Sequence, residues 1–157
     1  MDFVVIGGYA AVLHGSPAFT GDADICPDRA TSNLDRLAGA LHEMHARIRT
    51  DAEPEGLPFA CDAQFLAAMT VAVNLTTDYG DVDLSYYPAA FPNGYPDLLP
   101  HAVEYDIDGL RVKVASLADI IRSKEAANRP KDHATLPILK ALQDEIADLE
   151  HEARGEQ

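Results

Sequence analysis

Three aspartates fall in segments whose residue pattern predicts β-strands. Asp22 and Asp24 are two positions apart in the segment 22–26, so the two-residue period of a strand places both carboxylates on one face, and Asp83 lies in a second predicted strand. Carboxylates ~4 Å apart repel by about 4 kcal/mol per pair at an effective dielectric near ~20, so a cation must offset them. An all-oxygen ligand set favours one or two Mg²⁺ ions, which hold substrate phosphates at phosphoryl-transfer sites. The alternative is three ordinary exposed acids among the 26 of the chain.

A pair of glycines, Gly7 and Gly8, follows the apolar run 3–6 and precedes an apolar segment that predicts a short helix. Strand, glycine turn and helix in this order leave backbone N–H groups free at the positive end of the helix dipole. A triphosphate can dock there without interference from side chains. The pair stands 14 residues before Asp22, counted from position 8 to position 22, a distance that a helix and a turn can fold back across.

The segment 5–24 contains both the glycine pair and the D-x-D aspartates, and it resembles the opening motif of the DNA polymerase β-like nucleotidyltransferase superfamily. Within that superfamily it is most similar to the AbiEii/MenT-type toxins of bacterial toxin–antitoxin systems. A second stretch, 116–132, resembles the late helix of the family with its lysine and the Arg-Pro-Lys-Asp run that follows it. The resemblance implies that Asp83 supplies the third acid of the site, with Asp81 as the less favoured register.

The resemblance also implies a reaction, in which an acceptor hydroxyl attacks the α-phosphate of an NTP and pyrophosphate leaves. The implied Mg²⁺ ligands are Asp22, Asp24 and Asp83, and the implied nucleotide-binding residues are Gly7, Gly8, Thr20, Lys124, Arg129 and Lys131. Lys124 would also act in catalysis as a point charge on the triphosphate. Asp132 would orient Lys124 or Lys131 rather than bind metal. The alternative for the three cations is a structural one, because positive charge is favourable near the C-terminus of a helix.

The acceptor follows from the same resemblance. The toxin relatives modify the 3′ end of tRNA with pyrimidine nucleotides, so tRNA is the implied acceptor and an antitoxin protein the implied partner. Transfer to a small hydroxylated molecule such as an aminoglycoside, or to a protein side chain, is the alternative among enzymes. A catalytically silent, antitoxin-like binding module is the alternative outside enzymes, and the complete set of three aspartates argues against it.

The charge of the chain is unevenly distributed. Its 157 residues carry a net charge of −14, yet the window 111–140 holds seven of the 12 basic residues and only three acids, a local charge of +4. The rest of the chain therefore carries −18, and nucleic acid could approach only the basic window. Two cysteines outside any CxxC pair indicate a reducing cytoplasm. No signal peptide and no apolar run of ~20 residues is present, so no membrane segment is expected.

Periodicity and turn residues predict the elements that position these groups. Strands are expected at 3–6, 22–26, 69–76, 82–86, 103–107 and 110–115, and helices at 9–14, 31–46, 62–68, 116–128 and 131–154. The segments 50–60 and 88–101 are expected to be irregular. The prediction is one mixed α/β (α+β) nucleotidyltransferase domain over residues 1–157. In it, a small mixed sheet with flanking helices (1–115) carries the site, and helices (116–157) close it.

Overall fold

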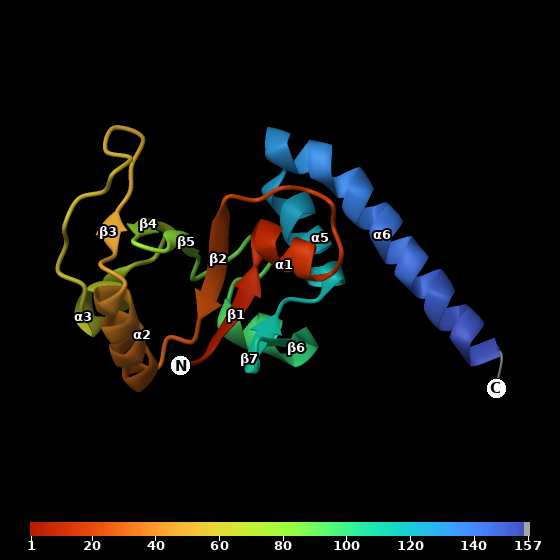
Figure 1. The fold of residues 1–157 in the computed structure, drawn as a ribbon, viewed down its shortest axis with the longest axis horizontal. Helices are drawn as coiled ribbons and strands as arrows, with labels where there is room; N and C mark the ends of the chain where they lie inside the picture. Colours follow the sequence, from red (N-terminus) through yellow and green to blue (C-terminus); the bar gives the residue numbers. More distant parts are fainter. Residues whose placement is uncertain (156–157) are drawn as a thin grey trace.

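The structure is a computed structural model that describes residues 1–155, so the last two residues of the predicted domain lie outside it. Seven strands form one mixed sheet in the order β3-β4-β5-β2-β1-β7-β6 (Figure 1). The strands are β1 (Phe3–Ile6), β2 (Asp22–Pro27), β3 (Arg47–Ile48), β4 (Val73–Thr77), β5 (Gly80–Leu84), β6 (Val103–Ile107) and β7 (Leu110–Val114). Two neighbouring pairs, β2–β5 and β1–β7, run parallel, and the others are antiparallel. The predicted mixed α/β class is confirmed.

Six α-helices and one 3₁₀-helix accompany the sheet in the described residues. The α-helices are α1 (Gly7–Leu13), α2 (Thr31–Glu43), α3 (Ala63–Ala68), α4 (Tyr95–Leu98), α5 (Leu117–Ala127) and α6 (Pro130–Gly155), and the 3₁₀-helix is Leu99–His101. Helix α1 packs against β2 and α5, and α5 packs against α6. The C-terminal part of α6 extends away from the rest of the protein (Figure 1). No helix in the part of the chain that the structure describes is long and apolar enough to cross a membrane.

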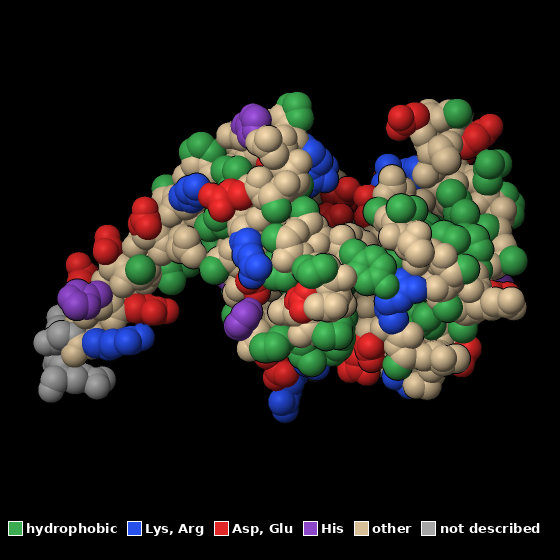
Figure 2. Space-filling view, turned by 180° about the vertical axis from the view of Figure 1, so that it is seen from behind, with side chains coloured by type: hydrophobic (Ala, Val, Ile, Leu, Met, Phe, Trp, Pro, Cys, Tyr) green, Lys and Arg blue, Asp and Glu red, His purple; other side chains and the backbone are tan. Residues whose placement is uncertain are grey.

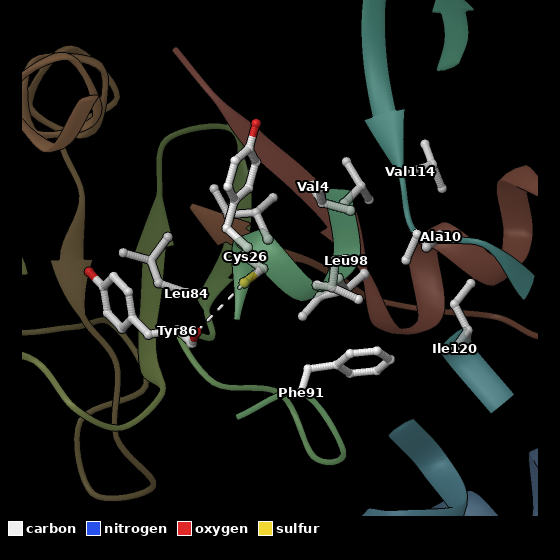
Figure 3. Close-up of a cluster of buried hydrophobic side chains, with 14 of the residues drawn as sticks. Val4, Ala10, Cys26, Leu84, Tyr86, Phe91, Leu98, Val114 and Ile120 are labelled. Carbon is white, nitrogen blue, oxygen red and sulfur yellow. Dashed lines mark hydrogen bonds between the residues drawn. The ribbon is translucent and has the colours of Figure 1, made fainter. Parts of the chain in front are cut away.

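The core lies between the central strands and the elements that cover them. Val4, Cys26 and Leu84 come from three adjacent strands and are fully buried, and Leu98 from α4 packs into the same cluster (Figure 3). Burial of such side chains contributes about 1.5–3 kcal/mol each. The core therefore fixes β1, β2 and β5 side by side, which are the strands that carry the glycine turn and the three aspartates.

Most predicted elements are present, and the differences have local causes. The helix predicted to reach residue 46 ends at Glu43, because the backbone turns at His45, whose φ is 54°. The strand predicted from 69 begins at Val73, and its partner ends at Leu84 rather than 86. The short strand β3 was not predicted. The segment 88–101, which was expected to be irregular, contains α4. The turn at Asp108 and Gly109, between the predicted strands 103–107 and 110–115, has positive φ at both residues, as a type I′ hairpin turn requires.

Candidate active site

The three aspartates of the predicted cluster meet across the central strands. The parallel pairing of β2 with β5 places Asp24 opposite Asp83 and Asp22 opposite Asp81. Asp22, Asp24 and Asp83 each offer one carboxylate oxygen, and these oxygens all lie within 4.8 Å of one another. Asp81, the alternative register, is not part of this group.

The cluster carries more negative charge than its surroundings offset. Burial, together with repulsion from Asp22 and Asp83, raises the pKa of Asp24 to about 6, although Lys131 and Arg129 oppose the shift. Burial also raises the pKa of Asp83 above its ordinary value, against the opposing charge of a nearby arginine, Arg49. Crowded carboxylates of this kind are stabilised by a hard cation. The donor set therefore fits Mg²⁺.

The glycine turn lies directly against the cluster. Gly7 has a φ of +66°, and a Cβ at this position would collide with the carboxylate of Asp24. A Cβ at Gly8 would lie 2.8 Å from Oγ1 of Thr20. The Thr20 hydroxyl is within hydrogen-bonding distance of Asp22, 3.1 Å from Oδ1 and 3.2 Å from the backbone oxygen. Both glycines are thus required by the close approach of site residues, and Thr20 joins the turn to the first aspartate.

The predicted cations come from the junction of α5 and α6, and a buried aspartate organises two of them. Asp132 is fully buried, and its carboxylate accepts from Lys124 Nζ at 3.2 Å and from Arg129 Nε at 2.7 Å. Burial raises the pKa of Asp132, but hydrogen bonds from Arg129 and Lys124 outweigh it and lower the pKa to about 2. The sequence predicted Lys124 or Lys131 as the partner of Asp132, and the structure shows Lys124 and Arg129. Lys131 is left exposed beside them.

A cleft of about 470 Å³ is lined both by aspartates of the cluster and by the cations of the α5–α6 junction. Eight of the ten predicted site residues line it: Gly7, Gly8, Thr20, Asp22, Asp24, Lys124, Arg129 and Lys131. Asp83 does not line the cleft but lies opposite Asp24 in the pairing of β2 with β5, and Asp132 is fully buried. In Figure 2 the hollow appears as a notch with acidic side chains at its floor and basic side chains on its walls. A ligand that carries both phosphates and a metal ion would find partners for both there.

Arg49 is a site residue that the sequence analysis missed. It follows β3, and its backbone N–H donates to Asn74 of β4 at 2.9 Å. Its side chain reaches β5, where Nη2 donates to Oδ1 of Asp83 at 3.0 Å and Nε lies 3.3 Å from Oδ2 of Asp81. The residue stands between a helix and a loop-like segment in sequence, so only the pairing of β3 with β4 could have indicated that it reaches the aspartates.

Comparison with known proteins supports the fold. No model of a known protein family matches the chain, and no curated protein matches its sequence. The chain is similar to the lincomycin-bound crystal structure of the lincosamide antibiotic adenylyltransferase LnuA, with a TM-score of 0.57 and 13% identity over 90% of this chain and 87% of that one. It is also similar to TM1012 of Thermotoga maritima, a protein proposed to be a nucleotidyltransferase, with a TM-score of 0.52 and 18% identity over 91% and 83% of the two chains.

The chain has a nucleotidyltransferase fold. The similarity extends over 90% of the chain in one comparison and 91% in the other. The nucleotidyltransferase fold predicted from the motif is therefore confirmed. The AbiEii/MenT-type subgroup stays a prediction.

Proposed function

We propose that this protein is a Mg²⁺-dependent nucleotidyltransferase that transfers an NMP group from an NTP to an acceptor hydroxyl. The observation that carries the proposal is the meeting of three carboxylate oxygens within 4.8 Å of one another beside a glycine turn that has no room for side chains. Lys124, Arg129 and Lys131 line the same cleft and supply positive charge for phosphates. Carboxylates that can hold Mg²⁺, cations that can bind phosphate and a cleft that contains both are the parts that phosphoryl transfer needs.

In the proposed reaction the acceptor oxygen forms a bond to the α-phosphorus, and the bond from that phosphorus to pyrophosphate breaks. Asp22, Asp24 and Asp83 would hold Mg²⁺. The bound ion would neutralise phosphate charge and polarise the reacting phosphate group. Gly7 and Gly8 allow the triphosphate to approach the backbone, and Lys124, which lines the same cleft, supplies positive charge to it. We assign the proton of the acceptor hydroxyl to the Asp83 carboxylate.

A small hydroxylated molecule is the acceptor that the charge distribution favours. Four of the seven basic residues in the window 111–140 pair with acids: Lys124 and Arg129 share Asp132, Arg111 pairs with Glu104, and Lys140 pairs with Glu125. The seven residues are also distributed over β7, α5, the α5–α6 junction and α6, whereas the affinity of a protein for a nucleic acid backbone depends on many cations that contact phosphates together. The fold similarity to LnuA, an adenylyltransferase of a lincosamide antibiotic, supports the same class of acceptor.

The 3′ end of tRNA is the second candidate acceptor. The Arg129 side chain is 53% exposed and Lys131 is exposed, and both line the cleft, where they could contact an acceptor phosphate. With this acceptor the protein would be a toxin that blocks translation with a pyrimidine nucleotide, and an antitoxin would neutralise it. Both candidates draw on cellular NTP, so we propose a cytoplasmic location.

One labelling experiment tests the function and separates the acceptors. The protein is incubated with each α-labelled NTP, Mg²⁺ and either total tRNA or a panel of aminoglycosides and lincosamides. Label on a small molecule is expected, and label on tRNA would establish the second candidate instead. Asp22→Asn should abolish either product while its circular dichroism spectrum remains that of the wild type. A variant that still labels its acceptor would refute the proposed site, and absence of label on every acceptor class, protein included, would favour a silent binding module.

A further inference from the structure

The most exposed large hydrophobic side chain of the described residues lies at the proposed nucleotide site. Phe19 is 96% exposed, whereas the other exposed hydrophobic side chains range from 37% to 83%. Single exposed hydrophobic residues are common on protein surfaces. Phe19, however, stands in the segment between α1 and β2, and it lines the same cleft as Gly8 and Asp22. An aromatic ring that has no protein partner beside a ligand cleft is available to the ligand.

Hydrogen bonds anchor the segment that carries Phe19 on both sides of this residue. On one side the Ser16 N–H donates to Ala11 of α1 at 3.0 Å, and the Ser16 hydroxyl accepts from the N–H of Ala18 at 3.3 Å. On the other side Thr20 Oγ1 lies 3.1 Å from Oδ1 of Asp22. The backbone that carries Phe19 is therefore anchored on both sides, between α1 and the first aspartate of β2.

The groups of the cleft divide by chemistry in a way that matches a nucleotide. Glycine backbone, carboxylates and cations provide for the triphosphate and its metal ion. The lining also includes aromatic side chains, namely Phe19, Tyr87 and Phe91. A nucleobase is flat and has a π-face, and aromatic side chains hold bases by stacking on that face whatever the base.

We propose that Phe19 is the surface on which the base of the bound NTP stacks. The inference rests on the proposed function, since it names the base-binding part of that nucleotide site. Stacking does not read hydrogen-bonding groups of the base, so the four NTPs should bind through Phe19 with similar affinity. Any preference for one nucleotide then comes from the acceptor step or from groups other than Phe19.

The absence of tryptophan from the sequence makes the proposal directly testable. Phe19→Trp introduces a single tryptophan, and ATP, GTP, CTP and UTP with Mg²⁺ should each quench its fluorescence, whereas inorganic tripolyphosphate should not. Leu110→Trp is the matched control, because Leu110 is 70% exposed and lies in the β6–β7 hairpin, and its fluorescence should not respond. Phe19→Ala should weaken NTP binding in calorimetry about tenfold and leave tripolyphosphate binding unchanged.

The outcomes distinguish this inference from the proposed function. If the wild type binds NTP in calorimetry but Phe19→Trp shows no quenching, the base-stacking role is wrong and the nucleotide site stands. Quenching by tripolyphosphate equal to that by NTP, or by an acceptor alone, would also overturn it. If no NTP binds to the wild type, the proposed function fails and the base-stacking role fails with it. Because the Phe19 side chain is almost fully exposed, both variants should keep the melting temperature of the wild type, which is measured first.

Discussion

Arg49 donates from Nη2 to Oδ1 of Asp83 at 3.0 Å, and this ion pair joins the segment after β3 to the carboxylate cluster. The same side chain lies against Asp81, so one guanidinium holds two acids of β5. Planar guanidinium groups orient carboxylates better than an ammonium group does, because their donors have fixed directions. Arg49 therefore fixes the third aspartate of the site against repulsion from the other two.

Replacement of Arg49 should slow the transfer step without weakening nucleotide binding. In Arg49→Gln we expect kcat to fall about tenfold or more and the KM for NTP to change less than about twofold, because Arg49 contacts Asp83 and not the cations of the cleft. Arg49→Lys should recover only part of the loss, since lysine keeps the charge but not the two-directional contact. Steady-state kinetics with the identified acceptor measures both constants. A rise in KM with kcat unchanged would place Arg49 in substrate binding instead.

The crowding of the aspartates should make the metal-free protein less stable as the pH rises. The pKa of Asp24 is about 6 in the folded protein against 3.8 for a free side chain, so the folded state binds the proton more tightly. This cost is absent below about pH 4, grows as the pH passes through 6 and amounts to at most ~3 kcal/mol above it. Asp24→Asn should therefore raise the free energy of unfolding at pH 8 and leave it unchanged at pH 4, as measured by urea unfolding in EDTA.

Mg²⁺ provides the control for that experiment. It should stabilise the wild type at pH 8, where Asp24 is ionised, more than at pH 5, where the proton competes for the same carboxylate. The Asp24→Asn variant should respond less at both pH values. A variant that is less stable than the wild type in EDTA at pH 8 would show that Asp24 is satisfied by the protein itself.

Asp132 should have the opposite pH dependence. Its pKa is about 2 in the folded protein against 3.8 for a free side chain, so its contribution to stability is complete above about pH 4 and is lost as the pH falls through 2. Asp132→Asn leaves Lys124 without its buried partner and should cost about 3–5 kcal/mol at pH 7. The difference between variant and wild type should shrink between pH 4 and 2. Denaturant unfolding at several pH values measures this.

Glu125→Gln is the matched control for Asp132, because it breaks a surface pair of the same two helices. Glu125 pairs with Lys140 at 2.5 Å, and both side chains are about half exposed. Exposed pairs contribute at most ~1 kcal/mol. A loss as large in Glu125→Gln as in Asp132→Asn would mean that the helices α5 and α6 are held by surface charge rather than by the buried aspartate.

Local patterns in the sequence were sufficient to locate those parts of the candidate site whose residues lie close together along the chain. The glycine turn, the D-x-D strand and the α5–α6 junction are each marked within a few residues by Gly, Pro and alternating apolar positions. The choice between Asp81 and Asp83 could not be made this way, because residues two apart share a face of a strand. In the structure Asp83, and not Asp81, lies in the group with Asp22 and Asp24, and this placement depends on the long-range pairing of β2 with β5.

The partners of the cations were only partly predictable for the same reason. Asp132 and Arg129 are three positions apart, so their contact is local, but Arg129 precedes Pro130 and its direction depends on how α6 begins. The sequence also has seven basic residues in the window 111–140, whereas the fold distributes them over β7, α5, the α5–α6 junction and α6. Whether basic residues that are close in sequence share one surface depends on how the helices and strands that carry them are arranged.

Replacement of Gly7 should affect both the stability of the fold and the position of the Asp24 carboxylate. Gly7→Ala forces a φ of +66° on a residue with a side chain, which costs about 1–3 kcal/mol, and its Cβ would displace the Asp24 carboxylate from the cluster. We expect a lower melting temperature and loss of nucleotidyl transfer beyond what the stability loss explains. Gly39→Ala in the exposed face of α2 is the control, since nothing lies within 4 Å of its Cβ and alanine should stabilise the helix by about 0.5–1 kcal/mol. If Gly7→Ala keeps full activity at a temperature where it is folded, the aspartates do not need the close approach of the glycine turn. The turn would then have to be removed from the proposed site.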